Sequence, residues 1–290
     1  MRIVVSGNCQ VSGIAEALRT LRGDWTITSL PIGLPETIWA EHGRNAINTC
    51  DAWVRMRTPR DHVLGQPPSP AVIVEIPPLA FSGFHPDIVF AALGDSQFLG
   101  LTAYHSAIAL WAWRAGLSVE QTMPLYSSEI LIELGYLNAW RDSVAEMEAT
   151  FSALGLDFRP VWQRLMQLGV FMHTVNHPRI EALSLLAKLV AIRLGAEDSI
   201  WDDPVERYVR DELDTAVWPV YPAIADVLGV PQSVRWRLLD TTYRDLFTYL
   251  EAAWNAYGDT DRRMVTCAQL DGTNSIYSSV LSRATGASVA

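Results

Sequence analysis

The chain has 290 residues, of which 49% are hydrophobic and 19% charged, and this composition is typical of a folded globular protein with one large or two modest domains. Its net charge of −10 and pI near 5.0 argue against nucleic acid as the main partner, because binding a duplex requires a basic face. No apolar run approaches the roughly 18 to 20 residues that span a bilayer, and the start is too short for a signal peptide. We therefore expect a cytoplasmic protein with no transmembrane segment.

The cysteine content is low and odd in number. Cys9, Cys50 and Cys267 show no Cys-x-x-Cys spacing, so the sequence indicates neither a disulfide framework nor a cysteine zinc site. A cysteine with a function in this chain would therefore act through its reactivity.

In the first hundred residues, short β-type runs alternate with helical segments, which is typical of a largely parallel sheet wrapped by helices. Between the first two runs, Val11, Ile14 and Leu18 recur at helical spacing, and Gly23 marks the end of that helix. The fold class that we expect is α/β, with an N-terminal parallel-type sheet and flanking helices. The expected strands are 3–6, 25–30, 52–54 and 71–76.

From about residue 101 the pattern changes to one helix after another, so we predict a mainly α-helical C-terminal part. The segment 201–222 is interrupted by three prolines and is expected to be irregular. We place an α/β domain at 1–100 and a helical domain that completes the site at 101–290. The expected helices are 102–115, 119–126, 138–154, 160–168 and 178–194.

The strongest local signal is the segment 6–10, Ser-Gly-Asn-Cys-Gln, at the junction of the first strand and its helix. Ligands of open α/β sheets gather at the carboxyl ends of strands, where helix N-termini carry partial positive charge. A thiol at Cys9 is expected to have a lowered pKa there. Gly7 permits the tight turn, and Asn8 with backbone N–H groups is suited to an oxyanion hole. The alternative is that Cys9 is a small buried residue and Asn8 only an N-cap.

A second signal lies after the run at 71–76, in the segment 83–87, Gly-Phe-His-Pro-Asp. His85 is therefore expected at the same sheet edge as Cys9, where its imidazole would take the thiol proton and return it later. Asp87 would orient that ring. The alternative is that His85 is an ordinary turn residue.

Two further histidines are expected at helix starts. Thr102 is a natural N-cap that places His105 in the first turn, where the helix dipole favours the neutral ring. Pro178 fits a first helical position, with His177 or Asn176 as the cap. Both histidines are candidate ligand contacts, and both have the alternative of simple capping or packing.

The remaining charged residues give weaker signals. The proline-containing stretch 55–70 carries Arg55, Arg57 and Arg60, which are suited to binding an anion but are more typical of a solvated loop. The fingerprints of dinucleotide-binding, P-loop and serine-hydrolase proteins are absent from the sequence. A metal site, which we do not favour, would be built from His85, Asp87, His105 and His177.

Five segments together resemble the WcbI family of capsular-polysaccharide biosynthesis proteins, described as acetyltransferases. The resemblance implies an α/β part joined to a helical part, binding of coenzyme A, and a Cys–His pair. That pair would map onto Cys9 and His85, with His105 as the second choice for the histidine and His62 as the third. The segments are VSGNCQ at 5–10, FHPD at 84–87, YHS at 104–106, GLSVE at 116–120 and NHP at 176–178.

We therefore expect a transferase that moves an acetyl group from acetyl-CoA to a sugar hydroxyl, with or without an acyl-cysteine intermediate. Cys9 is the predicted nucleophile, His85 the acid and base, and Asn8 an oxyanion donor. The alternatives are a non-catalytic module that binds coenzyme A or a glycan, and an esterase similar to the SGNH type. In that type a serine occupies the position of Cys9, and this chain carries no evident C-terminal Asp-x-x-His. The residues expected to contact the cofactor or substrate are Gly7, Gln10, Tyr104, His105, Ser106 and His177.

Overall fold

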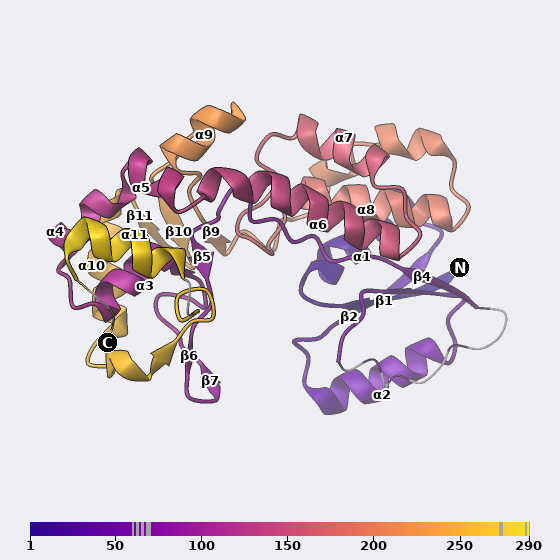
Figure 1. Cartoon of the computed structure of the whole chain (residues 1–290). Helices are drawn as coiled ribbons and strands as arrows, with labels where there is room; N and C mark the ends of the chain where they lie inside the picture. The colour runs from indigo at the N-terminus through magenta and orange to yellow at the C-terminus, as the bar shows by residue number, and fades with distance from the viewer. Residues whose placement is uncertain are drawn as a thin grey trace. The chain divides into compact units, whose positions relative to one another are not determined.

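The computed structural model describes residues 1–59, 61, 64, 67, 71–272, 275–287 and 289. The chain forms two compact units, each built from two stretches of sequence that Figure 1 distinguishes by colour. The first unit contains Met1–Ala80 and Ala145–Asp214, and the second contains Phe81–Val144 and Thr215–Ala290. This division differs from the predicted boundary at residue 100, because helices after residue 145 return to cover the N-terminal sheet.

The first unit is organised around a four-stranded sheet with the order β2-β1-β3-β4. All neighbouring strands are parallel, and β1 pairs with β2 on one side and with β3 on the other. The expected strands are thus confirmed, and with them the α/β class. The strand order reverses between β1 and β3, which is where ligands of open parallel sheets bind. The strands are β1 (Arg2–Gly7), β2 (Thr26–Pro31), β3 (Ala52–Arg55) and β4 (Val72–Glu75).

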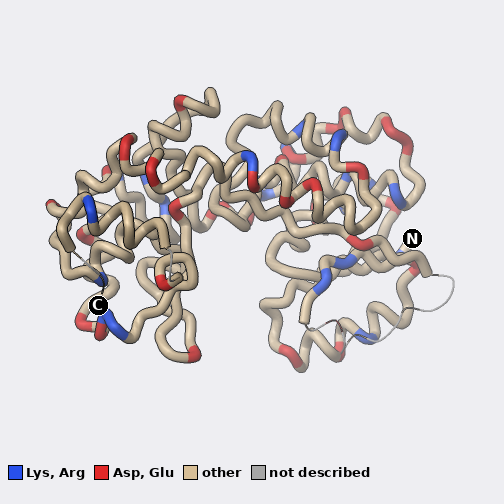
Figure 2. Tube along the Cα trace, in the orientation of Figure 1, with Lys and Arg blue, Asp and Glu red and all other residues tan. Residues whose placement is uncertain are grey.

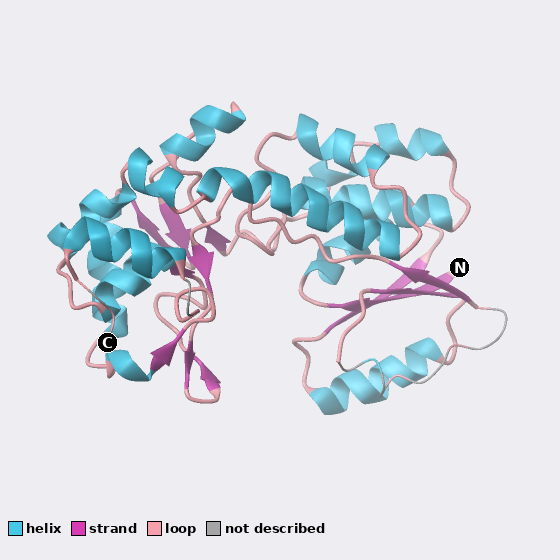
Figure 3. Ribbon diagram, in the orientation of Figure 1, coloured by secondary structure: helices cyan, strands magenta, loops and turns pink. Residues whose placement is uncertain are grey.

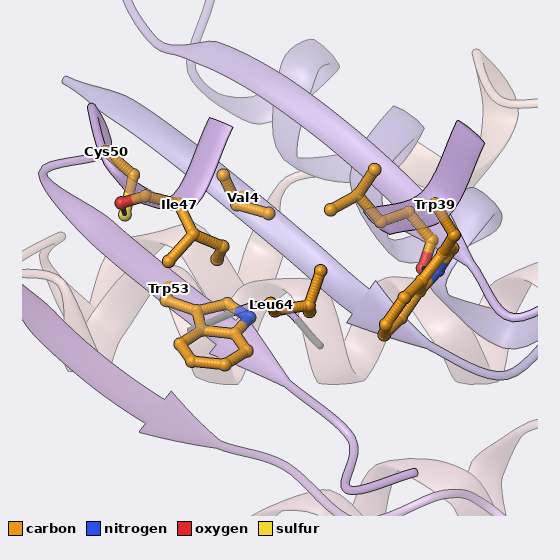
Figure 4. Close-up of a cluster of buried hydrophobic side chains, with 7 residues drawn as sticks. Val4, Trp39, Ile47, Cys50, Trp53 and Leu64 are labelled. Carbon is orange, nitrogen blue, oxygen red and sulfur yellow. Dashed lines mark hydrogen bonds between the residues drawn. The ribbon is translucent and has the colours of Figure 1, made fainter. Parts of the chain in front are cut away.

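Helices cover both faces of this sheet (Figure 3). On one face α2 (Glu36–Ile47) contributes Trp39 and Ile47 to a buried cluster with Val4 of β1 and Trp53 of β3 (Figure 4). Burial of each such side chain stabilises the fold by about 1.5–3 kcal/mol. The cluster therefore fixes β1, and with it the turn that follows β1.

On the other face, α1 (Gln10–Leu21) packs against α8 (Ile180–Arg193). A Cβ atom at Gly13 of α1 would lie 2.7 Å from Leu183 Cδ1 of α8, so the two helices approach closely because residue 13 has no side chain. The remaining helical segments of this unit are α7 (Arg159–Gln167), η4 (Asp198–Asp202), η5 (Val205–Arg207) and the end of α6 (Ala139–Ala153).

The second unit has α3 (Ala107–Arg114) at its centre, with every residue from Ala107 to Trp113 buried. Small antiparallel sheets accompany its helices, so this part is less purely helical than predicted. The sheets are β5 (Ile88–Val89) with β8 (His105–Ser106), β6 (Ala92–Leu93) with β7 (Ser96–Gln97) and β12 (Val265–Thr266), and β10 (Trp236–Leu238) with β9 (Ala216–Val217) and β11 (Thr241–Tyr243). The other helices are α4 (Val119–Thr122), η2 (Met123–Tyr126), α5 (Ser128–Glu133), η3 (Tyr136–Asn138), α9 (Pro222–Leu228), α10 (Leu246–Tyr257), η6 (Arg262–Met264) and α11 (Ile276–Thr285).

Two predicted helix starts are wrong. The helix expected from Thr102 begins at Ala107, because Ser106 is its N-cap and the Thr102 hydroxyl accepts a hydrogen bond from Tyr104 N instead. The helix expected from Pro178 begins at Ile180, because Pro178 is held in a β-bridge. Both errors concern histidine-containing segments, which are extended where the sequence predicts helix.

Acidic and basic residues occur in both units (Figure 2). The net charge of −10 is concentrated in the segment 197–214, which carries eight acidic and two basic residues. Among the described residues, no helix combines the length and the apolar character that crossing a membrane requires.

Candidate active site

The turn at residues 7–10, which we call the Cys9 turn, follows β1 directly. Gly7 has a φ of +155°, and a Cβ atom there would lie 2.7 Å from Met56 Cβ and 2.9 Å from Val11 Cγ1. A larger residue would collide with the end of β3 and the start of α1. Glycine thus sets the close approach of the turn to β3, as its position predicts.

Asn8 shapes the start of α1. Its Oδ1 accepts a hydrogen bond from Gln10 N at 2.9 Å, and its backbone oxygen accepts one from Val11 N at 3.3 Å. Cys9 is the N-cap residue, but its side chain makes no capping hydrogen bond, and the residue is exposed. The alternative of a buried structural cysteine is therefore wrong for Cys9, whereas Cys50 and Cys267 are buried.

The protonation state of Cys9 differs from the expectation. Although the residue contacts solvent, the protein packed around its sulfur disfavours the thiolate and raises the pKa of the Cys9 thiol, an effect that a backbone hydrogen bond offsets only in part. The helix start does not reverse this desolvation. Cys9 is therefore a neutral thiol at neutral pH and needs a base before it can act as a nucleophile.

Gln10 connects the Cys9 turn to two other segments of the first unit. Its amide is fully buried: Oε1 accepts from Leu79 N at 2.9 Å, and Nε2 donates to Leu79 O at 2.8 Å and to Asn176 O at 3.0 Å. These bonds occupy the side chain that the sequence assigns to cofactor binding. The buried Gln10 side chain thus holds the Cys9 turn in place and links Asn176 to the start of α1.

Residues 171–179 form a short hairpin before α8. Met172 pairs with Pro178, and His173 N donates to His177 O at 2.7 Å. The N-cap of α8 is Arg179, so neither His177 nor Asn176 caps that helix, contrary to the prediction. The hairpin backbone and not the helix start determines where His177 lies.

Asp211 organises this hairpin. Its Oδ2 accepts from His173 Nε2 at 2.8 Å and from Ile180 N at 3.1 Å, and its Oδ1 accepts from Leu213 N at 3.1 Å. Burial by itself would raise the pKa of Asp211, but the hydrogen bond from His173 and the positive charge that His173 can carry leave that pKa below its usual value. Asp211 is therefore an ionised carboxylate that fixes one imidazole and the first turn of α8.

His177 is partly buried beside this carboxylate. Burial lowers the pKa of the His177 imidazole, and the nearby His173 adds to the effect, while a hydrogen bond with the Leu213 backbone and the charge of Asp211 oppose it. The ring is accordingly neutral at pH 7, the form that can accept a proton.

The predicted acid–base residue His85 lies in the second unit. It is 1% exposed, and its Nδ1 is 3.2 Å from Pro219 O. The Cys9–His85 pair thus joins residues of two different units and stays a prediction.

Asp87, the predicted orienting group, is buried at the centre of the second unit. Its carboxylate accepts from the hydroxyls of Tyr136 and Tyr221, each at 2.7 Å, and from Ile108 N at 3.2 Å. Burial raises the pKa of Asp87 despite these donors, and the pKa values of both tyrosines are raised well above normal. These bonds give Asp87 a structural role that the sequence does not predict.

His105 is held within an aromatic cluster of the same unit. Its Nε2 donates to Phe98 O at 3.0 Å, so its Nδ1 is the acceptor for the Tyr257 hydroxyl at 3.1 Å. Burial lowers the pKa of His105, and its ring stacks on Phe98. The ring is 1% exposed and both nitrogens are engaged, which is typical of a core histidine and matches the packing alternative.

The residues on either side of His105 in the chain also make contacts within the second unit. Ser106 Oγ caps α3 by accepting from Ala109 N at 3.1 Å and also contacts the Tyr126 hydroxyl, while the Tyr104 ring packs on Phe90. Ligand contact by these residues stays a prediction. In the part of the chain that the structure describes, no three His, Cys, Asp or Glu side chains are grouped to hold a metal ion.

Two of the arginines considered for anion binding lie at the end of β3. Arg55 and Arg57 both bond to the carboxylate of Glu75, at the end of β4. The side chain of Arg57 is 71% exposed, whereas that of Arg55 is 20% exposed. Arg60 and His62 lie outside the described residues.

A comparison with known protein families identifies the family of this chain. The family described as "Polysaccharide biosynthesis enzyme WcbI" matches residues 2–199. The chain belongs to the WcbI family. A solved structure of WcbI, described as a novel polysaccharide biosynthesis enzyme, has a TM-score of 0.65 and 17% identity to this chain, and covers 87% of this chain and 88% of that one. It is described as the native protein without a disulfide bond between coenzyme A and one of its cysteines. No curated protein matches the chain.

Within this WcbI-family chain, sequence reasoning missed His173 and Asp211. His173 precedes the noted Asn-His-Pro by three residues, but Asp211 lies in a stretch without periodicity. Only the fold places the two within 2.8 Å of each other. The sequence could have indicated this pair only if the proline-containing stretch after residue 201 had been predicted to pack against the hairpin.

Proposed function

We propose that this chain is an acyltransferase that moves an acetyl group from acetyl-CoA to a sugar hydroxyl during polysaccharide biosynthesis. The observation that carries the proposal is the exposed thiol of Cys9 at the carboxyl end of β1, where the strand order reverses beside β3. Family membership supports polysaccharide biosynthesis. The description of the WcbI structure with coenzyme A supports that molecule as the acyl carrier.

The first half-reaction acylates the cysteine. A histidine takes the proton from Cys9 Sγ, the thiolate attacks the acetyl carbonyl, and a new S–C bond forms. The tetrahedral intermediate then breaks the bond to the coenzyme A sulfur, which leaves with the proton from the imidazolium. A base is required because the neutral thiol is the resting form of Cys9.

The second half-reaction regenerates the cysteine. The same histidine takes the proton of the acceptor hydroxyl, whose oxygen attacks the thioester carbon, and the Cys9 S–C bond breaks as the sulfur regains a proton. Direct attack of the sugar oxygen on acetyl-CoA would give the same products without an acyl-cysteine. The two routes differ in whether acetyl-Cys9 forms in the absence of acceptor.

The negative charge of the tetrahedral intermediate needs hydrogen-bond donors. Asn8 Oδ1 is bonded to Gln10 N, which leaves the amide NH₂ of Asn8 as the donor end of that side chain. This NH₂ group and backbone N–H groups of the Cys9 turn are the donors that we propose. Asn8→Ala should lower the turnover number by about 10²-fold, the usual cost of one such donor.

The proposal is tested with coenzyme A binding and acetyl transfer on the same preparations. We expect micromolar binding of coenzyme A and acetyl-CoA in calorimetry, with no binding of an unrelated nucleotide. Cys9→Ala should abolish transfer to a panel of sugars, whereas Cys267→Ser, at a buried cysteine, should retain it. Undiminished transfer by Cys9→Ala would contradict the nucleophile role.

A second candidate, a module that binds coenzyme A or a glycan without catalysis, is favoured by the raised pKa of Cys9. The two candidates differ in covalent chemistry. Intact-mass analysis after incubation with acetyl-CoA should detect a gain of one acetyl group in the wild type and none in Cys9→Ala. Acetate release without any acceptor sugar would instead indicate the esterase alternative.

A further inference from the structure

The first unit contains a cavity of about 530 Å³ where α7, α8 and the short helices η4 and η5 meet. Figure 1 shows α7 beside α8, and the two helices are in contact. The volume is in the range of about 300–1,000 Å³ that is usual for sites of small molecules. We call it the α8 cavity, after its lining residues Glu181, Leu185 and Lys188 on that helix.

The α8 cavity and the Cys9 turn lie on opposite sides of α8. Leu183 of α8 faces Gly13 of α1, the helix that the Cys9 turn begins. Successive residues of an α-helix are about 100° apart, so Glu181 and Leu185 lie about 160° from Leu183 around the helix axis. The width of one helix, roughly 10 Å, therefore separates the cavity from α1. A ligand in the cavity leaves the reacting groups at Cys9 unoccupied.

Lys188 is the only lysine in a chain with 22 lysines and arginines. Its side chain is 5% exposed, and its Nζ donates to Trp201 O at 3.3 Å and lies 3.7 Å from Glu206 Oε2. Lysine is rarely buried without close partners, and both distances exceed the roughly 2.7–3.2 Å of ordinary N–H···O bonds. An ammonium group has three N–H donors. Because these two contacts are its polar contacts among the described residues, Lys188 has a donor left for a ligand in the cavity.

Trp201 provides an aromatic wall of the α8 cavity. Arg164 Cζ lies 4.3 Å from the centroid of its ring, and Arg164 Nη1 donates to Pro160 O at 3.1 Å, so the guanidinium is held against the indole. The backbone oxygen of the same tryptophan accepts the bond from Lys188. The wall therefore combines an indole, a guanidinium and an ammonium whose positions the protein itself fixes.

The charges of the lining residues select the class of ligand. Three carboxylates line the cavity, at Glu181, Asp202 and Glu206, against the two positive charges of Arg164 and Lys188. The excess of negative charge disfavours phosphates and other anions, because like charges repel in a partly enclosed site. Coenzyme A, which carries several phosphate charges, is therefore a poor ligand for this cavity.

The cavity wall offers hydrogen-bonding groups of both kinds. Lys188 and Arg164 only donate, the ionised carboxylates only accept, and the amides of Gln163 and Gln167 do both. A hydroxyl group also donates and accepts, so a ligand with several hydroxyls can pair with each of these groups. The apolar carbons of its ring can pack on the indole of Trp201. A neutral sugar combines these properties.

We propose that the α8 cavity is a saccharide-binding site that holds a neutral sugar unit. Lys188 is its buried hydrogen-bond donor and Trp201 its packing surface. The inference rests on the proposed function for its purpose: a site one helix away from α1 holds a second unit of a polymeric acceptor and raises the effective concentration of that acceptor near Cys9. No covalent bond forms or breaks in the cavity.

The single lysine makes the test local. Wild-type protein that incorporates lysine labelled with ¹³C at Cε gives one such carbon signal in NMR, from Lys188. Titration with the methyl glycosides of glucose, galactose, mannose and N-acetylglucosamine at millimolar concentrations should move this signal to saturation for at least one glycoside. Glucuronate and coenzyme A, both anionic, should move it less. A signal that no glycoside moves, or that either anion moves more strongly, would overturn the inference.

Two variants test the cavity wall while the Lys188 signal stays in place. Glu181→Gln removes a charged acceptor and Gln167→Ala removes an amide, so each should bind the best glycoside several-fold more weakly. Glu148→Gln is the matched control, because Glu148 is an exposed residue of α6 in the same unit. Circular dichroism confirms the fold of each variant. Unchanged affinity in both wall variants, or an equal loss in Glu148→Gln, would place the sugar elsewhere and reject the site.

The Lys188 signal does not depend on acetyl transfer, and Cys9→Ala should retain its response to the glycoside. If the signal responds as expected but the wild type transfers no acetyl group, the saccharide site stands and the proposed acyltransferase function fails. If transfer occurs but no glycoside moves the Lys188 signal, the proposed function stands and this inference fails.

Discussion

The two units use similar polar residues in opposite ways. In the first unit, Cys9 is exposed and His177 partly buried, and Gln10 and Asp211 hold the segments that carry them. In the second unit, Asp87 and His105 are sealed in the interior with all their bonds made to the protein. Titratable residues at the ends of secondary-structure elements thus occur in two environments, and partial exposure distinguishes the proposed site from the buried hydrogen-bond network.

The largest expected effect is on stability and comes from the second unit. Asp87→Ala leaves two tyrosine hydroxyls and one backbone N–H without their buried acceptor, and each such group costs about 1–3 kcal/mol. We expect a loss on the order of 4 kcal/mol in the free energy of unfolding. Denaturant titration measures it. A loss below about 1 kcal/mol would contradict the structural role of Asp87 in the second unit and leave this residue available for catalysis.

The pH dependence of the unfolding free energy gives a second test of the buried Asp87 carboxyl group. The pKa of Asp87 is raised in the folded state, so the folded protein binds its proton more tightly than the unfolded chain does. Its contribution to stability is fully present below the ordinary carboxyl pKa and is lost as the pH rises through the raised value. Asp87→Asn cannot titrate, so its unfolding free energy should lack this decline when compared with the wild type over the same pH range.

The substitution Gln10→Leu should have the next largest effect on stability. It removes the acceptor of Leu79 N and the donor to two carbonyls, for an expected loss of about 2–4 kcal/mol in the first unit. Denaturant titration beside the wild type measures this loss. A loss below about 1 kcal/mol would mean that the hairpin keeps its place without these three bonds.

Gly7→Ala tests the turn itself. The added methyl group would lie 2.7 Å from Met56 Cβ, so we expect a loss of about 1–3 kcal/mol by denaturant titration. Gly23→Ala is the matched control, because nothing lies within 4 Å of a Cβ atom at that position. Equal effects for the two variants would show that the close approach of Gly7 to β3 does not constrain the turn.

Sequence patterns predicted the sheet and the Cys9 turn because both depend on local features: buried runs of Ile3, Val4 and Val5, and a glycine where a strand passes into a helix. They could not predict Asp211, whose importance comes from a contact 38 residues away in sequence with His173. They also misjudged the pKa of Cys9, because desolvation depends on the packing around the sulfur. Long-range contacts and local packing therefore decide which of several plausible residues form the site.

The smallest expected effect on stability concerns Arg57, at the sheet edge that carries the Cys9 turn. Its pair with Glu75 is exposed on the arginine side, so Arg57→Ala should change the unfolding free energy by less than about 1 kcal/mol. If Arg57 also contacts a phosphate of coenzyme A, the variant should bind coenzyme A several-fold more weakly, with a smaller dependence of affinity on salt. Arg141→Ala, at an exposed arginine paired with Asp142, should leave the affinity unchanged. Equal calorimetric affinities for both variants would confine Arg57 to its surface ion pair and exclude it from the proposed coenzyme A site.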